Sequence, residues 1–189
     1  EVHSLTSCED VKQRLNAASV PGIEITSVKI LPDKAGNAMA SVAAAGYTVA
    51  FREGRGPHFD LGSAVDRFLA KDEILITKET KKGSREINLK EGIYEMKVVE
   101  SEKLYLLVDA SSAGNIKPIQ VIEASFLSLV KDISCEALFS ENGETLQENA
   151  LLVNREETYL RNETDTLLPL DAIGFDSEEA YRAASGDSE

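Results

Sequence analysis

One stretch, residues 73–130, constrains the fold more than any other part of the chain. Apolar and polar residues alternate in it at the period of β-strands, and short polar turns separate the runs. The alternation predicts strands over 73–79, 85–89, 93–99 and 103–109, with Gly83 supplying a positive φ in the first turn. A loop then leads to Pro118, which starts a helix over 118–130, because proline at the first helical position gives up no hydrogen bond. Consecutive strands joined by short turns indicate an antiparallel sheet.

The flanking segments add further helices and strands. Ser7 is expected to cap a helix whose buried stripe includes Val11 and Leu15, and Pro21-Gly22 is expected to end it. The alanine-rich region 38–51 is read as a strand packed closely against a helix, although its first part also fits a helix by propensity. The remaining expected elements are a strand over 23–30, a helix over 61–70, a strand over 133–140 with an Asn142-Gly143 turn, a strand or short helix over 151–160, and a short docked helix within 171–184.

These elements define the expected fold class and domain organisation. We expect an α+β protein in which antiparallel sheets carry helices on one face, built from split β-α-β units of ferredoxin-like type. The chain is long enough for one large domain or two small ones. We divide it into an N-terminal subdomain (1–70), a C-terminal subdomain (71–160) and an acidic tail (161–189) that is partly disordered.

The charge of the chain is unevenly distributed. The formal net charge is −13, but residues 141–189 hold 13 acidic and only 3 basic side chains, so the rest of the chain is nearly balanced. An acidic segment of this kind keeps a protein soluble or competes for a basic partner. It does not favour a chain that binds nucleic acid over its whole surface.

Several classes of protein are excluded by the pattern of apolar residues and cysteines. No apolar run approaches the roughly 20 residues that a membrane-spanning helix needs. Cys8 and Cys135 show no short Cys-x-x-Cys spacing, which excludes a zinc ribbon or an iron–sulfur cluster held by this chain alone. Two lone cysteines fit the reducing cytosol, although a disulfide between them is an alternative. On this compartment argument we expect a cytoplasmic protein. No signal peptide is visible after Glu1, and we expect the natural start to lie upstream.

Three ordered motifs resemble a known family. They are ITKETKKGSREINLKEGIYEM (76–96), SSAGNIKPIQVIEA (111–124) and VNREETYL (153–160), preceded by VKQRLNAASVPGIEITSVK (11–29) and SVAAAGYTV (41–49). In this order they resemble the radical SAM-linked domain of unknown function, over about residues 5–160. The resemblance implies a domain that occurs alone or fused behind a radical SAM enzyme, in connection with RNA or ribosome-related genes. It also implies a missing N-terminal part with a strand, an arginine-rich helix and a Phe-Asn-Pro-His-like turn.

The first candidate site is the basic turn between the first two strands of the 73–130 stretch. Exposed cations on the tip of a hairpin can straddle a phosphate backbone. The alternative is an ordinary solvated hairpin, since lysines on exposed strands also discourage edge pairing. No aromatic residue lies between these cations, so stacking on bases is not expected there. The basic residues are Lys78, Lys81, Lys82 and Arg85.

The second candidate site is the loop that precedes the Pro118 helix. Helix N-termini present unpaired N–H groups to anions, small residues let a ligand approach, and a lysine adds charge. The alternative is a connector in which glycine permits an unusual φ. The residues are Ser112, Gly114, Asn115 and Lys117, with Ser111 at the start of the loop.

The remaining polar candidates are isolated. Arg155 and Tyr159 can read a phosphate and a ring, or can be an ion-pair residue and a packed edge residue. His3 and His58 have no nearby Cys or His, so a metal site is not expected, and His58 with Asp60 fits an acid–base pair less well than a surface loop. Glu156-Glu157 and Glu178-Glu179 are adjacent in sequence, which does not favour a shared acid–base dyad.

These observations favour a binding module over an enzyme. The sequence offers no nucleophile, metal cluster or paired-base arrangement, and it implies no cofactor. We expect a non-catalytic accessory domain that binds or presents a substrate, expected to be RNA, for a radical SAM partner. The alternative is a scaffold whose acidic C-terminal segment contacts a basic surface of another protein.

Overall fold

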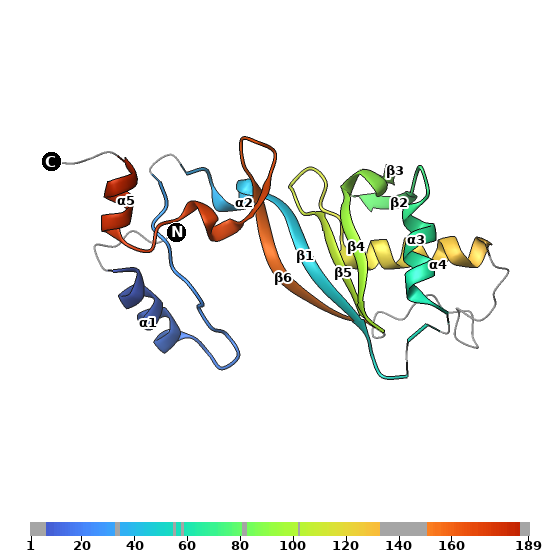
Figure 1. Cartoon of the computed structure of the whole chain (residues 1–189), viewed down its shortest axis with the longest axis horizontal. Coiled ribbons are helices and arrows are strands. Elements are labelled where there is room, and N and C mark those ends of the chain that lie inside the picture. The colour runs from blue at the N-terminus through green and yellow to red at the C-terminus, as the bar shows by residue number, and fades with distance from the viewer. Residues whose placement is uncertain are drawn as a thin grey trace. The chain divides into compact units, whose positions relative to one another are not determined.

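The structure of the protein is a computed structural model (Figure 1). Strand β1 (Val42–Phe51) is the central strand of its main sheet. The structure describes residues 7–32, 35–54, 56–57, 59–80, 83–101, 103–132 and 151–185, with the backbone alone for 79–80 and 126–132. The chain divides into two units. The first combines Glu1–Ala38 with Pro169–Glu189, and the second is Met39–Leu168.

The five-stranded sheet has the order β4-β5-β1-β6-β7. β1 is antiparallel to both β5 and β6, and β5 is antiparallel to β4. Irregularities interrupt the β4–β5 register between Ile93 and Glu95 and between Val98 and Glu100. The strands around β1 are β4 (Ile93–Glu100), β5 (Lys103–Asp109), β6 (Leu151–Arg161) and β7 (Leu167–Pro169).

Two helices connect strands that are not neighbours in the sheet. Helix α3 (Leu61–Leu69) lies in the connection from β1 to β4, and α4 (Pro118–Asp132) lies in the connection from β5 to β6. Each connection skips one strand, so the strands that it joins run parallel to each other. Figure 1 shows both helices on the same side of this sheet. The expected α+β class is therefore confirmed, whereas the ferredoxin-like type stays a prediction.

The expected hairpin forms a second, separate sheet. β2 (Leu75–Thr80) pairs with β3 (Gly83–Asn88), and Gly83 has a φ of +114°. A 3-10 turn, η1 (Lys90–Gly92), leads from it into β4. The hairpin belongs to the connection between α3 and β4.

The core of the second unit lies between the helices and one face of the main sheet. The burial of alternate β5 residues reproduces the expected pattern, and Phe68 of α3, only 1% exposed, packs with them. Asp60 caps α3 by accepting a hydrogen bond of 2.7 Å from the Ser63 N–H. The buried residues of this face include Ala45, Tyr47, Val49, Phe51, Met96, Leu104, Leu106, Val108, Val121 and Ile122.

The first unit joins the two ends of the chain. Residues Ile30 and Phe175 exchange two backbone hydrogen bonds of 2.8 Å, and Lys29 makes an ion pair of 2.7 Å with Asp176. Its elements are α1 (Cys8–Ala18), the 3-10 turn η4 (Leu170–Ile173) and α5 (Glu178–Ser185). The docked helix expected within 171–184 is therefore present as α5, and Ser7 caps α1 as expected, accepting from the Asp10 N–H.

Some expected elements are wrong. Residues 23–29 form no strand, and only an isolated bridge occurs at Ile30. The reason is that the Asn16 side chain takes the place of a strand partner: it accepts from the Ile25 N–H at 2.7 Å and donates to the Ile25 carbonyl at 3.0 Å. The α1 stripe is not buried either, since Leu15 is 39% exposed and no residue of that helix is buried.

Other expectations are refined. The alanine-rich region starts as the short helix α2 (Ala38–Ser41) before β1, in line with the propensity of alanine. Residues 151–160 belong to a strand, the first of the two alternatives. Residue 71, the expected subdomain boundary, lies within the second unit. The expected strand 133–140, the Asn142-Gly143 turn, Cys135, His3 and His58 lie outside the described residues.

Candidate nucleic-acid interface

The second face of the five-stranded sheet is the most distinctive surface of this unit. We call it the open face, because α3 and α4 lie on the other side of the sheet (Figure 1). Its central strand contributes Ala44, Gly46 and Thr48, which alternate with the core residues of β1. These residues are small, so long side chains from the outer strands can lie flat across β1.

Two tyrosines meet above this strand. Tyr105 of β5 lies against Gly46, and its hydroxyl is hydrogen-bonded to that of Tyr159 of β6. Burial, together with the Tyr159 hydroxyl, raises the pKa of Tyr105 to about 12. The ammonium of Lys97 lies 5.2 Å from the centroid of the Tyr105 ring. Tyr105 therefore stays neutral at physiological pH and presents a ring with a cation beside it.

An arginine and a third tyrosine meet on the open face, coming from strands on either side of β5 and β1. The guanidinium of Arg161, at the end of β6, lies 5.4 Å from the ring centroid of Tyr94 in β4. β1 and β5 separate these strands, so the two side chains meet across the central strands. Burial lowers the pKa of Arg161, but Asp165 and Tyr94 together raise it above its ordinary value. Tyr94 is 40% exposed, so a ligand can reach its ring.

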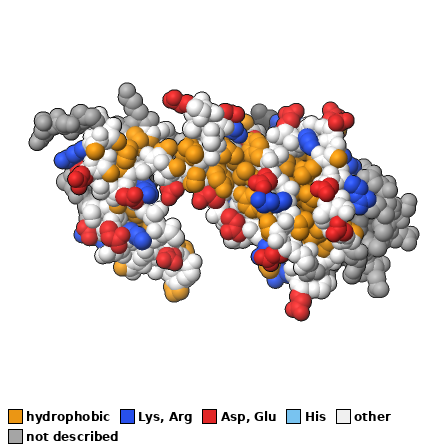
Figure 2. Space-filling view, in the orientation of Figure 1, with side chains coloured by type: hydrophobic (Ala, Val, Ile, Leu, Met, Phe, Trp, Pro, Cys, Tyr) orange, Lys and Arg blue, Asp and Glu red, His pale blue; other side chains and the backbone are white. Residues whose placement is uncertain are grey.

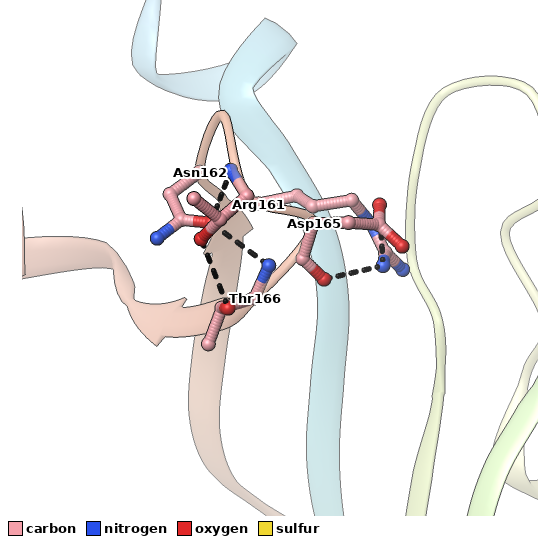
Figure 3. Close-up of polar contacts among 5 residues, drawn as sticks. Arg161, Asn162, Asp165 and Thr166 are labelled. Carbon is pink, nitrogen blue, oxygen red and sulfur yellow. Dashed lines mark hydrogen bonds and ion pairs between the residues drawn. The ribbon is translucent and has the colours of Figure 1, made fainter.

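The turn after β6 holds this arginine in place. Arg161 donates to both the side chain and the backbone carbonyl of Asp165, at 3.1 and 3.2 Å, and Asp165 has a positive φ of 63°. The Asn162 side-chain oxygen accepts from the Thr166 N–H at 2.8 Å and also from Thr164. Figure 3 shows the Arg161 and Asp165 side chains side by side at this turn. The bonds to Asp165 thus hold the Arg161 side chain at the turn while its guanidinium lies over the Tyr94 ring.

Carboxylates also occupy the open face. Glu156 accepts hydrogen bonds from the Thr48 hydroxyl at 2.5 Å and from the Asn154 amide at 2.9 Å, and these bonds lower its pKa. Glu95 makes an ion pair of 2.7 Å with Lys97. Figure 2 shows acidic and basic side chains intermixed on the visible face of the molecule, without a large area of one sign. Rings and planar groups, more than net charge, distinguish the open face.

The structure brings two of the sequence-predicted segments together. The Lys78 ammonium of β2 donates to the backbone carbonyl of Asn115 at 3.4 Å, which joins the basic hairpin to the loop before α4. Asn115 has a positive φ of 40°. Arg85 lies opposite Lys78 in the hairpin register, and both are in described strands. The positions of Lys81 and Lys82 lie outside the described residues.

The loop before α4 already holds a carboxylate of this chain. Asp109 accepts from the Ser111 N–H at 2.7 Å, and Gly114 lies so close to that carboxylate that a β-carbon would collide with it. Gln120 caps α4 by accepting from the Lys117 N–H at 3.0 Å. The side chains of Ser112, Asn115 and Lys117 are exposed at this loop. An incoming anion would therefore meet side chains here, and not a vacant nest of amides.

Arg155 and Tyr159 do not form one site. Arg155 donates to the Tyr47 hydroxyl at 2.8 Å, with its guanidinium 5.2 Å from that ring, and Tyr47 belongs to the core cluster. Tyr159, in contrast, contacts Tyr105 on the open face. The two residues therefore have separate partners.

The open face was missed by sequence reasoning, although part of its signal was present. The alternation of Leu104, Leu106 and Val108 places Tyr105 on the opposite face of the same strand. The pairing of Tyr94 with Arg161 has no comparable signal, because the two residues are 67 positions apart in the chain and lie on strands that are not neighbours.

The aromatic residues and the hairpin cations lie near the same end of the sheet. Val108 pairs with Ile93, and Ala44 pairs with Asp109, so the end of β5 lies beside the start of β4 and the end of β6. The loop that Lys78 contacts follows β5 directly. The hairpin itself packs through Ile76 and Ile87 against the core cluster, on the covered side of the sheet, so a ligand that touches both the hairpin and the open face has to pass around this end.

The described residues show neither a metal cluster nor a membrane-spanning helix. No three His, Cys, Asp or Glu side chains gather there in an arrangement that could hold a metal ion. None of the helices in the described ranges combines the length and the apolar character needed to cross a bilayer.

These features define the second unit as an α+β domain with an aromatic open sheet face. Residues 1–118 match the family described as "Uncharacterized protein conserved in bacteria (DUF2344)", so the chain belongs to this family. Comparison with curated proteins and with solved structures gave no match. The expectation of a domain family without an assigned function is confirmed, whereas the radical SAM link is not part of this match and stays a prediction.

Proposed function

We propose that this protein is a non-catalytic module that binds single-stranded RNA across the open face of its second unit. The observation that carries the proposal is the gathering of Tyr94, Tyr105 and Tyr159 on one sheet face, with Lys97 and Arg161 beside the rings. Proteins recognise single-stranded RNA largely by stacking its bases on aromatic side chains and guanidinium planes, and an antiparallel sheet is a common platform for this.

The charges of the face indicate how such a ligand would bind. Glu95 and Glu156 lie on the same surface, so phosphate attraction alone would be weak there. Stacking does not depend on net charge, because every base has a π-face. In this structure Lys97 lies over the Tyr105 ring and Arg161 lies over the Tyr94 ring. When RNA binds, both cations leave these rings and contact phosphates of the RNA backbone. The Lys97 side chain, 55% exposed, has room for this movement.

The basic hairpin supplies the phosphate contacts in this proposal. Lys78 and Arg85 lie on paired strands, and Lys78 contacts the loop that follows β5. Cations at this end of the sheet would hold the backbone of a strand whose bases stack on the tyrosines. Lys81 and Lys82 are expected to add to this charge, together with the exposed Lys117.

The remaining parts of the proposal come from the sequence. The resemblance to radical SAM-linked domains supports a role in which RNA is presented to such a partner enzyme, and the lone cysteines support a cytoplasmic location. The two β-α-β connections that each skip one strand support a ferredoxin-like core.

A scaffold function is the second candidate. It is favoured by the exposed carboxylates of residues 171–179, which lie on structured backbone in the first unit: Asp171, Asp176, Glu178 and Glu179. A basic protein surface would complement them. Neutralising these four residues would weaken capture of a basic partner and leave RNA affinity unchanged or higher.

The experiment that tests RNA binding is fluorescence anisotropy with short, labelled uridine-rich and adenosine-rich single strands at low salt. We expect Tyr94→Ala to weaken binding about tenfold, because the loss of one stacking ring typically costs that much or more. Tyr181→Ala, which removes a tyrosine of α5, is the matched control and should bind like the unmodified protein. Equal affinities for all three proteins, or no binding at low salt, would refute the proposal.

A further inference from the structure

A pocket of about 430 Å³ lies along the free edge of the two-stranded hairpin sheet. The end of α3, the β2 strand and the first turns of α4 line it. No residue of β3 contributes to the lining, so the pocket follows the side of β2 that faces away from its partner. Its floor is apolar, with Phe68 and Ile74 buried and Leu75 half-exposed.

The hairpin register shows which backbone groups face this side. Leu89 donates to the Ile74 carbonyl at 2.8 Å, and hydrogen-bonded pairs alternate with non-bonded pairs along an antiparallel ladder. Leu75 opposite Asn88 and Thr77 opposite Glu86 are therefore non-bonded pairs. The N–H and C=O groups of Leu75 and Thr77 thus point away from β3, and the described part of the chain offers them no partner.

The rim of the pocket carries two carboxylates. Glu73 precedes β2 and Glu123 lies on α4, and within the described ranges neither makes an ion pair. Lys71 also lines the pocket and has a partner of its own, so the two carboxylates leave the charge of the lining negative. A ligand that contributes a cation beside an apolar group would complement this rim. A third strand would also stabilise the hairpin, because an isolated two-stranded sheet is only marginally stable in water.

From this geometry we propose that the pocket binds an extended peptide segment of another protein, which adds as a third strand to β2. The peptide backbone pairs with Leu75 and Thr77, an apolar side chain enters the floor beside Phe68, and a neighbouring Lys or Arg lies near Glu73 and Glu123. Main-chain hydrogen bonds supply affinity in this mode, and the pocket supplies the preference for side chains. This site is separate from the open face, so it stands whether or not RNA binds there.

The probe is a fluorescent hexapeptide of alternating valine and lysine, with a valine–glutamate hexapeptide for comparison. We expect saturable binding of the first in an anisotropy titration, and binding at least tenfold weaker for the second, because its carboxylates face those of the rim. Equal binding of the two peptides would overturn the charge part of the proposal, and no binding of either would overturn the site.

A matched pair of proline variants tests the backbone contact. Thr77→Pro removes an N–H on the free edge of β2, and Glu86→Pro removes the N–H of the residue opposite it, on the free edge of β3. Both leave the bonds within the hairpin intact. We expect Thr77→Pro to weaken peptide binding at least tenfold and Glu86→Pro to leave it unchanged. An equal effect in both variants, or none in either, would overturn the proposal.

A modified peptide covers the case in which the Thr77→Pro variant does not fold. Methylating alternate backbone nitrogens of the valine–lysine peptide removes one edge of its hydrogen bonds and leaves the protein unchanged. Only one of the two methylation registers should abolish binding. Sedimentation of the protein alone tests whether a second copy of this chain fills the edge instead of another protein. A dimer that Thr77→Pro dissociates would show that it does, and would overturn the proposed partner.

Discussion

Tyr105 lies directly against Gly46: its hydroxyl oxygen is 2.7 Å from the position that a β-carbon on Gly46 would take. The two residues belong to adjacent strands at the centre of the sheet. The missing side chain of Gly46 thus permits the Tyr105 ring to lie flat on the open face. This contact gives the aromatic surface a specific requirement in β1.

We expect Gly46→Ala to destabilise the protein by up to about 2 kcal/mol, because the added methyl group displaces the Tyr105 hydroxyl, whereas alanine is itself favoured over glycine in a strand by about 0.5–1 kcal/mol. Urea denaturation measures the change. Gly62→Ala in α3 is the matched control, since the nearest atom to its added methyl group is the Asp60 carboxylate at an ordinary 3.5 Å. Alanine in a helix should stabilise that variant by about 0.5–1 kcal/mol. Similar effects at both sites would contradict the role assigned to Gly46.

The raised pKa of Tyr105 makes a prediction for alkaline solution. Burial and the Tyr159 hydroxyl raise that pKa from 10.0 to about 12 in the folded protein. Between these values the unfolded chain loses the proton and the folded protein keeps it, so the free energy of unfolding falls as pH rises. The contribution is complete below pH 10.0 and is lost as pH approaches about 12. Tyr105→Phe should reduce this alkaline loss.

Ultraviolet absorbance of the phenolates measures the same effect directly. One tyrosine of the folded protein should ionise near pH 12, and Tyr105→Phe should remove that late transition. Tyr159→Phe removes the hydroxyl partner and should lower the pKa of Tyr105 only in part, because burial is the larger cause. A late transition that persists in Tyr105→Phe would assign the shift to another residue.

Much of the second unit follows from local patterns in the sequence. The alternation in 103–109, the turn glycine at Gly83 and the helix start at Pro118 each depend on neighbouring residues, and the structure has the elements that they predict. Residues 23–30 failed the same reasoning. Their alternation resembles a strand, but the amide of Asn16 bonds both backbone groups of Ile25 and replaces a strand partner. A side chain nine positions away decided this segment.

The candidate site was less predictable, because it depends on register across the sheet. Tyr94 and Arg161 lie on strands that β5 and β1 separate, and their side chains meet across these two strands. The irregularity between Ile93 and Glu95 also shifts the local alternation of β4. A one-residue shift turns every side chain to the other face of a sheet. Local spacing in the sequence contains neither the strand order nor this shift.

The hairpin cations make a prediction for the salt dependence of RNA binding. We expect Lys78→Glu with Arg85→Glu to weaken binding of a labelled single strand and to lower the slope of log affinity against log salt by about one for each phosphate that is no longer bound. The double variant Lys12→Glu with Arg14→Glu in α1 makes the same change in net charge and is the control. If both double variants lower affinity equally, net charge and not the hairpin governs binding.

The stability of the second unit should depend strongly on Phe68. This side chain is 1% exposed and packs in the core cluster between α3 and the sheet, so Phe68→Ala leaves a cavity and should cost about 3–5 kcal/mol in urea denaturation. Leu75→Ala is the control: that side chain is 50% exposed on β2 and should change the free energy of unfolding little. The control has a second use, because Leu75 lines the proposed peptide pocket. Loss of peptide binding in Leu75→Ala with unchanged stability would separate the function of the pocket from the packing of the core, whereas a large loss of stability there would show that Leu75 belongs to the core.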